Sequence, residues 1–300
     1  MTCSVIPAIR RIAAVALLLF PFATPAQADP VQAIDARGTA LQLMQPAQRI
    51  VTLAPNLTEL VFAAGAGERL VGVARFSDYP PAARRLPVVS DAVQFDLERM
   101  LVLRADLVLA WQGGTPPDAI ARLERAGLPV FVAGASGLDD IARNITAIAQ
   151  FAGTAAAGAA ARAAFDADLR VLRARRHEGA RVRVFYEIWD RPLMTVNNAH
   201  LISEIITLCG GVNVFAGLQA LTPEVSREAL LSVRPDIVLG GSSADTPAAF
   251  AARWAALPPP FNGWTARHLP ADLMQRPTPR ILEGARRLCA HLDAVRTARH

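Results

Sequence analysis

Lysine is absent from the 300-residue chain, so its 31 lysine-or-arginine positions are all arginines. These arginines are scattered instead of forming patches with interleaved aromatic residues, which argues against nucleic-acid binding. Long apolar runs are also missing after residue 28, because no later segment approaches the roughly 20 apolar residues that a membrane-spanning helix needs. The hydrophobic fraction of 52% still allows one large domain or two lobes with sizeable cores.

The first 28 residues have the three parts of an export signal. Two arginines precede an apolar run over residues 12–20, and an A-x-A cleavage site ends at Ala28. We therefore predict a signal peptide, residues 1–28, whose cleavage near Ala28 leaves an exported protein. The alternative is a membrane anchor, but the run is shorter than the roughly 20 residues that a bilayer requires. Loss of the segment lowers the formal net charge from +5 to +3, because it carries no acidic residue.

Cysteine is scarce, with three residues in the chain. Cys3 precedes the apolar run of the signal peptide, so it is not placed as a lipoprotein cysteine. Cys209 and Cys289 remain as an even pair in an oxidising compartment, and we predict that they form a disulfide. The bridge would close a loop of about 80 residues, for which the chain-entropy model gives roughly 4 kcal/mol. Two free buried thiols are the alternative.

Apolar strands alternate with short helices along both halves of the chain. The expected strands cover residues 49–54, 70–74, 106–111, 129–133, 181–186 and 236–240. The expected helices cover residues 58–64, 97–103, 119–126, 201–208, 226–233, 250–256 and 281–295. Residues 29–47 are expected to form a leader strand and a turn. Strands that alternate with helices of about ten residues indicate parallel βαβ units, so the predicted fold class is α/β.

The longest amphipathic pattern, over residues 138–178, lies between the two halves. Asp139 and Asp140 at its start and arginines at its end suit the dipole of a helix. One continuous helix of this length would extend roughly 60 Å. Gly153 and Gly158 are the points at which it could be divided, since an interior glycine costs about 1 kcal/mol relative to alanine.

The segments on either side of this helical pattern resemble each other. Four glutamates match at equal spacing: Glu59 and Glu204, each six residues before a glycine, and Glu98 and Glu228, each eight residues before an aspartate. We infer two similar lobes with parallel sheets, residues 29–137 and 179–300, joined by one long α-helix over residues 138–178. Chance similarity between two generic βα units is the alternative.

Ligands bind beyond the carboxyl ends of the strands in an open parallel sheet, so two facing lobes would form a cleft lined by these loops. The loops are rich in aromatic, amide and glycine residues: Asn56 and residues 76–79, 111–114, 187–190 and 272–274. Such loops suit a bulky, partly apolar ligand whose flat rings stack on Trp or Tyr. Packing between the lobes is the alternative role for each aromatic residue.

Patterns that indicate catalysis or metal binding are scarce. The five histidines have no HxH or HExxH spacing, and no metal site is predicted. An exported hydrolase that uses Glu187, Asp190 or Asp272 as acid–base groups is an alternative, but no spacing in the sequence requires it. We therefore predict a binding protein that is not an enzyme and needs no cofactor.

Several motifs, taken in order, carry a resemblance to a known family. They are Ser77-Asp-Tyr-Pro-Pro81, Leu97-Glu-Arg99, Asp106-Leu-Val-Leu-Ala-Trp-Gln-Gly-Gly114, Leu208-Cys-Gly-Gly211, Asn213-Val-Phe215, Val225-Ser-Arg-Glu228 and Pro279-Arg-Ile281. Over residues 49–295 the chain resembles the periplasmic cobalamin-binding proteins of ABC importers. The resemblance implies a class III periplasmic binding protein, with two Rossmann-like lobes on a rigid helix and one ligand in the cleft. It also implies delivery of that ligand to a membrane permease dimer with a cytoplasmic ATPase.

The resemblance assigns roles to individual residues. Its implied ligand contacts are Tyr79 and Trp111, against the corrin ring, and the segment Asp272, Leu273, Met274, Gln275 and Arg276. Glu98 and Glu228 match two carboxylates, one in each lobe, that dock onto arginines of the permease. Cys209 and Cys289 match the family's disulfide.

This chain is less aromatic than its best-matched relatives. Ala92 and Thr222 stand where those relatives carry tryptophans, and Leu273 and Met274 stand where aromatic residues are expected. Trp189, in a different loop, is expected to compensate. Cobalamin or a related corrinoid such as cobinamide is the predicted transported ligand, with haem or an iron siderophore as alternatives. The protein is expected to act in the periplasm as a monomer.

Overall fold

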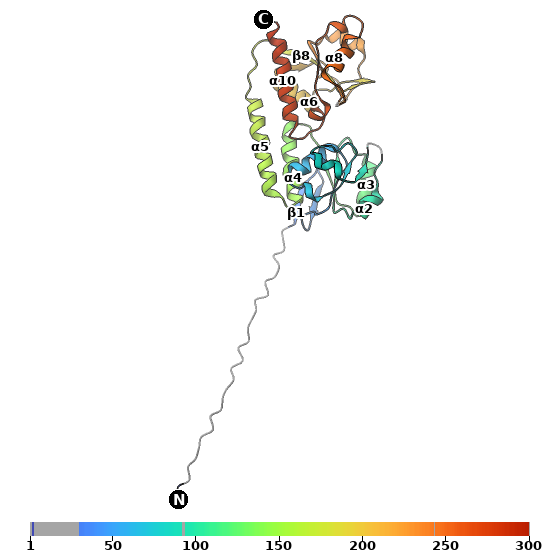
Figure 1. Ribbon diagram of the computed structural model, residues 1–300, viewed down its shortest axis with the longest axis vertical. Helices are drawn as coiled ribbons and strands as arrows, with labels where there is room; N and C mark the ends of the chain where they lie inside the picture. Colours follow the sequence, from blue (N-terminus) through green and yellow to red (C-terminus); the bar gives the residue numbers. More distant parts are fainter. Residues whose placement is uncertain (1, 3–29, 92–93, 243, 300) are drawn as a thin grey trace.

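The computed structural model describes residue 2 and residues 30–91, 94–242 and 244–299. The predicted signal peptide, except for residue 2, and Ala92 lie outside the described residues. The chain forms two α/β lobes, and helices α5 (Ala155–Arg173) and α10 (Ile281–Thr297) lie side by side along one edge of the molecule (Figure 1). Within the described ranges, no helix has both the length and the apolar content needed to cross a membrane.

The N-terminal lobe is built on a five-stranded parallel sheet with strand order β5-β4-β3-β6-β7. Its strands are β3 (Ile50–Thr52), β4 (Leu70–Ala74), β5 (Val88–Ser90), β6 (Leu107–Trp111) and β7 (Val130–Ala133). Its helices are α1 (Pro55–Ala63), α2 (Leu97–Val102) and α3 (Pro117–Arg125). The leader segment forms an antiparallel hairpin of β1 (Val31–Ile34) and β2 (Ala40–Leu43). The apolar strands are almost entirely buried, as expected for a parallel sheet covered on both faces.

The C-terminal lobe has a four-stranded parallel sheet with strand order β11-β8-β12-β13. Its strands are β8 (Val182–Glu187), β11 (Gly211–Asn213), β12 (Ile237–Gly240) and β13 (Ala266–His268), and a small hairpin of β9 (Trp189–Asp190) and β10 (Leu193–Met194) follows β8. Its helices are α6 (Leu201–Leu208), α7 (Arg227–Val233), α8 (Pro247–Ala255), α9 (Ala271–Met274) and α10. The predicted α/β class with two parallel-sheet lobes is therefore confirmed.

The connection between the lobes differs from the prediction, because residues 138–178 form two helices instead of one. Helix α4 (Leu138–Phe151) and helix α5 run antiparallel, so that Arg173 at the end of α5 pairs with Asp139 at the start of α4 at 2.9 Å. The chain reverses at Gly153, whose φ of +62° is readily adopted only by glycine. Gly158 allows close packing, since a Cβ there would meet Ala149. Helix α5 alone spans about 28 Å at 1.5 Å per residue.

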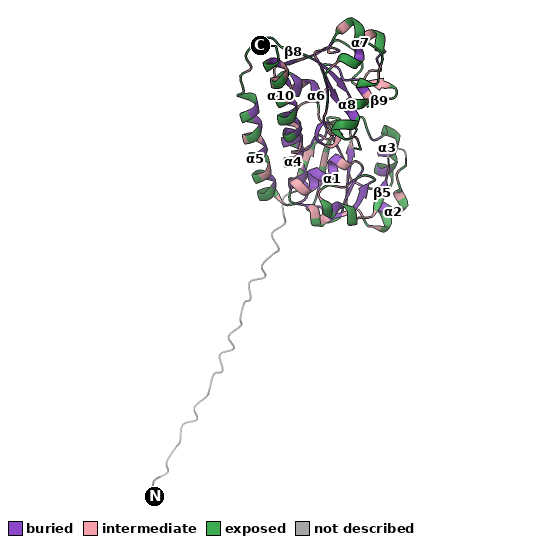
Figure 2. Cartoon of the chain, turned by 45° about the horizontal axis from the view of Figure 1, so that its top comes forward, coloured by how far each residue is buried: buried purple, intermediate pink, exposed green. Residues whose placement is uncertain are grey.

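The largest buried cluster is shared by both lobes and by the helices that join them. It includes strand residues such as Ile50 and Val184 together with Ile145 of α4, Phe165 of α5 and Leu288 of α10. Each sheet has a smaller buried cluster on its other face. The cluster of the N-terminal lobe lies under α2 and α3, and that of the C-terminal lobe lies under α7 and α8. In Figure 2 the buried faces of α4, α5 and α10 turn toward the sheets, and the exposed faces turn outward. Packing of one continuous core thus fixes the lobes to the helical edge.

The predicted disulfide is present in the structure. Cys209, directly after α6, is bonded to Cys289 in α10. Both cysteines are buried in the shared core. The bridge thus ties two helices of the C-terminal lobe to each other.

The internal repeat extends to matching side-chain contacts. Asp106 accepts a hydrogen bond from the backbone N–H of Arg49, and the Arg49 side chain donates to the carbonyl of Leu103, just past the end of α2. In the second lobe Asp236 accepts from the backbone N–H of Arg183, whose side chain donates to carbonyls at the end of α7. Equal contacts of this kind are not expected from chance similarity between generic βα units.

Candidate ligand-binding cleft

A cavity of about 710 Å³ lies between the two lobes. The N-terminal lobe contributes Phe76 and Asp78, which follow β4. The C-terminal lobe contributes residues 187–191 at the end of β8 and beyond it, Gly241, Ser242 and Asp245 after β12, Arg253 of α8, and four residues of the segment 271–276. Loops that follow the carboxyl ends of parallel strands are where open α/β sheets bind their ligands.

Two aromatic side chains in the cavity lining are exposed, one from each lobe. Phe76 is 76% exposed and Trp189 is 58% exposed. The backbone of Phe76 has a φ of +65°, an unfavourable conformation for a bulky residue, and its carbonyl accepts a hydrogen bond from Arg276 at 3.3 Å. The Trp189 indole N–H donates to the carbonyl of Arg191 at 2.9 Å. The Phe76 backbone and the Trp189 indole are thus held in place, while both rings stay in contact with solvent.

Arg276 links the two lobes at the cavity. Its guanidinium lies 2.7 Å from Asp78 and 3.0 Å from Glu59, both in the N-terminal lobe, and 3.0 Å from Asp272 of its own lobe. Burial opposes ionisation of Asp78, but the hydrogen bond and charge of Arg276 hold the pKa of that carboxyl below its ordinary value. The cavity floor at this point is therefore an ion-paired network that crosses the lobe boundary.

Glu59 is the buried centre of this network. Its carboxylate accepts hydrogen bonds from Thr278 at 2.9 Å and from Arg280 at 3.1 Å, in addition to Arg276. The Arg280 guanidinium lies 3.9 Å from the centre of the Tyr79 ring, in cation–π geometry. Tyr79 is about half exposed, next to the cavity, and does not line it.

A second buried ion pair forms the cavity wall of the C-terminal lobe. Glu187 lies within hydrogen-bond distance of both Arg253 nitrogens, at 2.5 and 3.1 Å, and accepts a hydrogen bond from the Trp254 indole at 3.0 Å. Burial raises the pKa of Glu187 above its ordinary value, and the favourable contacts with Arg253 and Trp254 offset this only in part. The pair positions a cationic side chain at the cavity surface.

The predicted ligand residues divide into three groups. Trp189, Asp272, Gln275 and Arg276 line the cavity. Leu273 and Met274 are buried below the cavity, because α9 turns these two side chains toward the core. Trp111 and Tyr79 lie outside the lining, and Trp111 is half buried against the shared core.

Several residues that line the cavity are not among the ligand contacts predicted from the sequence: Phe76, Asp78, Glu187, Arg191, Asp245 and Arg253. Glu187 was considered only as an acid–base group of the alternative hydrolase. Phe76, Asp78 and Glu187 belong to loops that were identified at strand ends, so their positions gave a partial signal. Arg253, on α8, comes next to Glu187 at the end of β8 only when the lobe is folded. No local sequence pattern therefore predicts that Arg253 lines the cavity.

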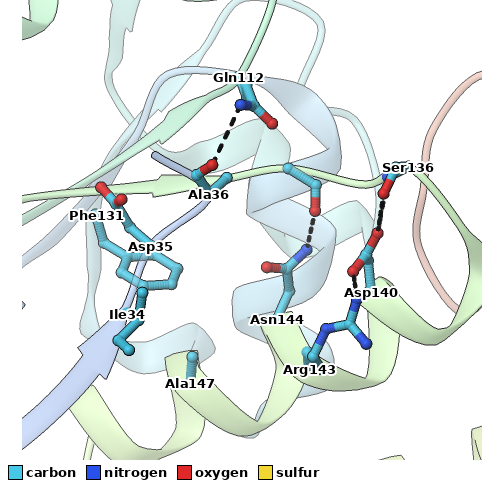
Figure 3. Close-up of a pocket in the computed structure, with 11 residues that line it drawn as sticks. Ile34, Asp35, Ala36, Gln112, Phe131, Ser136, Asp140, Arg143, Asn144 and Ala147 are labelled. Atoms are coloured by element: carbon cyan, nitrogen blue, oxygen red, sulfur yellow. Dashed lines mark hydrogen bonds and ion pairs between the residues drawn. The ribbon is translucent and has the colours of Figure 1, made fainter. Parts of the chain in front are cut away.

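A smaller cavity of about 240 Å³ lies inside the N-terminal lobe, between the leader hairpin, β7 and α4 (Figure 3). Its polar side chains bind one another or the backbone: Asn144 donates to the carbonyl of Gly134, Gln112 donates to that of Ala36, and Arg143 pairs with Asp140. Gly134 also lies close to Gln112. We therefore assign the ligand site to the larger cavity between the lobes.

The two predicted docking glutamates are exposed and lie on different lobes. Glu98 is in the first turn of α2 and Glu228 is in the first turn of α7. Both helices lie on the side of the molecule away from α5 (Figure 2). A backbone N–H and the Ser226 hydroxyl stabilise the charged form of Glu228 and lower the pKa of that carboxyl. The structure thus presents one solvent-exposed glutamate carboxylate on each lobe.

No cluster of three or more histidine, cysteine, aspartate or glutamate side chains with metal-binding geometry occurs in the part of the chain that the structure describes. In the inter-lobe cavity the carboxylates of Asp78, Glu187, Asp190 and Asp272 are instead paired with arginines.

Two α/β lobes with a ligand-sized cavity between them, joined at one edge by helices, define a two-lobed binding protein. Residues 50–278 match the family model described as periplasmic binding protein, and the chain belongs to that family.

Several relatives share most of the chain. The vitamin B12-binding protein of Vibrio parahaemolyticus serotype O3:K6 is 34% identical over 255 residues, which cover 85% of this chain and 93% of that protein. The crystal structure of the periplasmic vitamin B12 binding protein BtuF of Vibrio cholerae has a TM-score of 0.75 at 35% identity, covering 84% of this chain and 98% of BtuF. The periplasmic heme-binding protein BhuT, in complex with two hemes, has a TM-score of 0.73 at 28% identity, covering 84% and 99%.

Proposed function

We propose that this chain is the periplasmic binding protein of an ABC importer and that it captures cobalamin or a related corrinoid between its two lobes. The observation that carries the proposal is the inter-lobe cavity, which has one exposed aromatic ring from each lobe. The chain is also about one-third identical, over most of its length, to proteins named for vitamin B12 binding.

The chemistry of the cavity suits a corrinoid. A corrin is a broad ring system with apolar faces and amide side chains at its periphery. Phe76 and Trp189 supply apolar ring surface, while Asp272, Gln275 and Arg276 supply hydrogen-bond partners for amides. Arg276 is held by carboxylates of both lobes, including Asp272, and Gln275 donates a hydrogen bond to the carbonyl of Ile188, so these partners are in place before a ligand arrives.

Haem is the second candidate, since the heme-binding protein BhuT shares the fold at 28% identity. Haem iron is commonly held by His, Cys, Met or Tyr. None of these residue types is among the described residues that line the inter-lobe cavity. Two such residues lie just outside the lining: the ring of Tyr79 lies against Arg280, and His268 Nε2 is hydrogen-bonded to the carbonyl of Ser242 at 3.0 Å. The lining therefore favours a corrinoid over haem. An iron siderophore is a further alternative, and the dialysis experiment described next distinguishes it as well.

Equilibrium dialysis of the mature protein tests the ligand class. Cyanocobalamin or cobinamide should be retained at micromolar protein, and the visible spectrum of the retained ligand should show corrin bands. Hemin and a ferric hydroxamate, dialysed in parallel, should not be retained. Retention of hemin without either corrinoid would overturn the proposal in favour of a haem-binding protein.

The carboxylates proposed for a hydrolase are all engaged in ion pairs. Glu187 pairs with Arg253, Asp190 with Arg191 at 3.3 Å, and Asp272 with Arg276. A general acid or base must reach the substrate proton directly or through one water. Pairing of each candidate with an arginine supports a binding protein without catalysis.

The proposal also includes export of the protein to the periplasm and docking on a membrane permease. Cleavage of residues 1–28 near Ala28 would release the chain into the periplasm as a monomer. Glu98 and Glu228 would then dock onto arginines of the permease dimer, whose ATPase drives uptake. Rim charges of this kind set orientation and association rate more than affinity. The mass of the protein recovered from the periplasm tests the cleavage site, because the chain should begin at Asp29.

A further inference from the structure

The two helices that carry Glu98 and Glu228 begin in the same way in both lobes. The side chain of Asp96 accepts a hydrogen bond from the backbone N–H of Arg99 at 2.8 Å at the start of α2. The hydroxyl of Ser226 accepts one from Ala229 at 3.2 Å at the start of α7. These caps fix the first turn of each helix, which contains the glutamate.

The two helices also end in the same way. Arg49 and Arg183, each at the start of a central strand, donate to carbonyls at the carboxyl ends of α2 and α7. Each helix is followed by an arginine with positive φ, +50° for Arg104 just past α2 and +42° for Arg234 at the cap of α7. Two short helices are thus held at both ends by equivalent contacts, and each presents the same face outward.

That outward face carries an apolar side chain in each lobe. Leu101 is 47% exposed and Leu231 is 37% exposed. Each leucine is three residues after the docking glutamate and therefore on the same side of its helix. The residues before them, Met100 and Leu230, are fully buried and supply the core contact. The exposed leucines are thus not needed to anchor their own helices.

We propose that Leu101 and Leu231 are the apolar contacts of a surface that docks on the permease dimer, each seated beside its glutamate. The proposal rests on the proposed function, which supplies the partner. A two-fold symmetric partner fits because the contacts recur once per lobe at equal spacing in the internal repeat. A carboxylate beside a leucine requires a basic group next to an apolar hollow on each permease subunit.

The test measures binding of the mature chain, loaded with cyanocobalamin, to the vitamin B12 permease–ATPase complex of the same bacterium in lipid nanodiscs. The variant is Leu101→Ser with Leu231→Ser, and each single substitution is included. Val171→Ser is the matched control, because Val171 is 70% exposed on α5, on the other side of the molecule. Leu101→Met with Leu231→Met keeps an apolar side chain at both positions.

We expect each serine substitution to weaken docking roughly tenfold and the pair about a hundredfold, since each removes an apolar side chain from the interface. The methionine pair and the Val171 control should dock like the wild type, and all variants should retain cyanocobalamin. Unchanged docking of the double serine variant, or an equal loss in the Val171 control, would overturn the proposal.

The charge-reversed pair Glu98→Arg with Glu228→Arg separates this inference from the proposed function. Loss of docking in that pair with normal docking of the serine pair would overturn the leucine contacts alone. Failure of the wild-type chain to retain any corrinoid would instead overturn the proposed function, and with it the partner on which the leucine contacts depend.

Discussion

Glu59 and Glu204 occupy equivalent positions in the two lobes. Each glutamate binds a segment of the other half of the chain, at the point where that segment leads into helix α10 or helix α4. Glu59, in α1, accepts hydrogen bonds from three side chains in the stretch that precedes α10. Glu204, in α6, accepts a hydrogen bond from the backbone N–H of Leu138, the first residue of α4, at 2.8 Å. It also pairs with Arg173 at 3.2 Å. The lobes are therefore joined by two reciprocal contacts.

The two contacts differ in burial and in what surrounds them. The Glu59 side chain is 3% exposed and belongs to the network of Arg276 at the cavity floor. The Glu204 side chain is 33% exposed and lies at the helical edge, away from the inter-lobe cavity. The same repeat position thus serves two tasks: one glutamate orders the ligand site, and the other secures the start of a connecting helix.

Removal of the disulfide should cause the largest loss of stability among the variants compared here. The C-terminal half of the repeat has this bridge, and the N-terminal half has no cysteine at the equivalent position. Cys209 stands five residues after Glu204, and Ala64 stands five residues after Glu59. Cys209→Ser with Cys289→Ser should lower the free energy of unfolding by about 4 kcal/mol, because the bridge closes a loop of about 80 residues. Urea unfolding followed by circular dichroism measures this. A loss below about 1 kcal/mol would show that the C-terminal lobe does not depend on its covalent tie.

Removal of the buried glutamate should be the next largest effect. Glu59→Ala leaves Arg276 and Arg280 partly buried without a central carboxylate, and we expect a loss of about 3 kcal/mol in unfolding free energy. Cyanocobalamin affinity should fall as well, since Arg276 lines the cavity. Glu59→Gln is the matched control and should retain the Thr278 hydrogen bond. If Glu59→Ala unfolds like the wild type, the network does not hold the lobes together.

The equivalent change in the other lobe should be smaller. Glu204→Ala removes a partly exposed ion pair and one hydrogen bond donated by the Leu138 backbone N–H, which together contribute about 1 kcal/mol. Ligand affinity should not change, because Glu204 is remote from the cavity. The same urea titration provides the comparison with Glu59→Ala. Equal losses for the two alanine variants would contradict the difference in burial described above.

The start of α6 should make the stability depend on pH. His200 accepts a hydrogen bond from the backbone N–H of Ile202, whereas α1 starts at Pro55 without a side-chain cap. Burial lowers the pKa of His200 from 6.5 to about 4. Its contribution to stability is therefore complete above pH 6.5 and is lost as the pH falls toward 4.

His200→Asn tests this dependence, because asparagine caps a helix and does not titrate. Between pH 7.5 and pH 4.5 the wild type should lose more unfolding free energy than this variant. Parallel pH profiles for the two proteins would show that His200 is not the titrating group.

Much of the fold could be predicted because its signals are local. Apolar runs such as residues 129–133 predicted strands. The equal spacing of Glu98 and Glu228 from a following aspartate predicted the internal repeat. The strands β5, β11 and β13 were not predicted, because these three-residue strands, unlike β3, do not lie within a longer apolar run. The break at Gly153 could not be decided from the sequence, because both a long helix and a hairpin satisfy the same apolar periodicity, and only packing on the shared core selects the hairpin.

The site was predicted less completely. Trp189, Asp272, Gln275 and Arg276 were found because they follow strands or match family motifs. The orientation of α9 then buries Leu273 and Met274, which a motif match cannot reveal. Partners such as Glu59 with Arg276 are 217 residues apart, and pairing over that separation requires both lobes to be in place.

Titration calorimetry with cyanocobalamin tests the central claim, that a corrinoid binds between an aromatic ring of each lobe. The wild type should bind one cyanocobalamin per chain, and Phe76→Ala with Trp189→Ala should weaken binding about tenfold or more through loss of ring contact. Val171→Ser serves as the exposed apolar control and should bind normally. Equal affinity of the wild type and the double alanine variant would contradict the assignment of the ligand to this cleft.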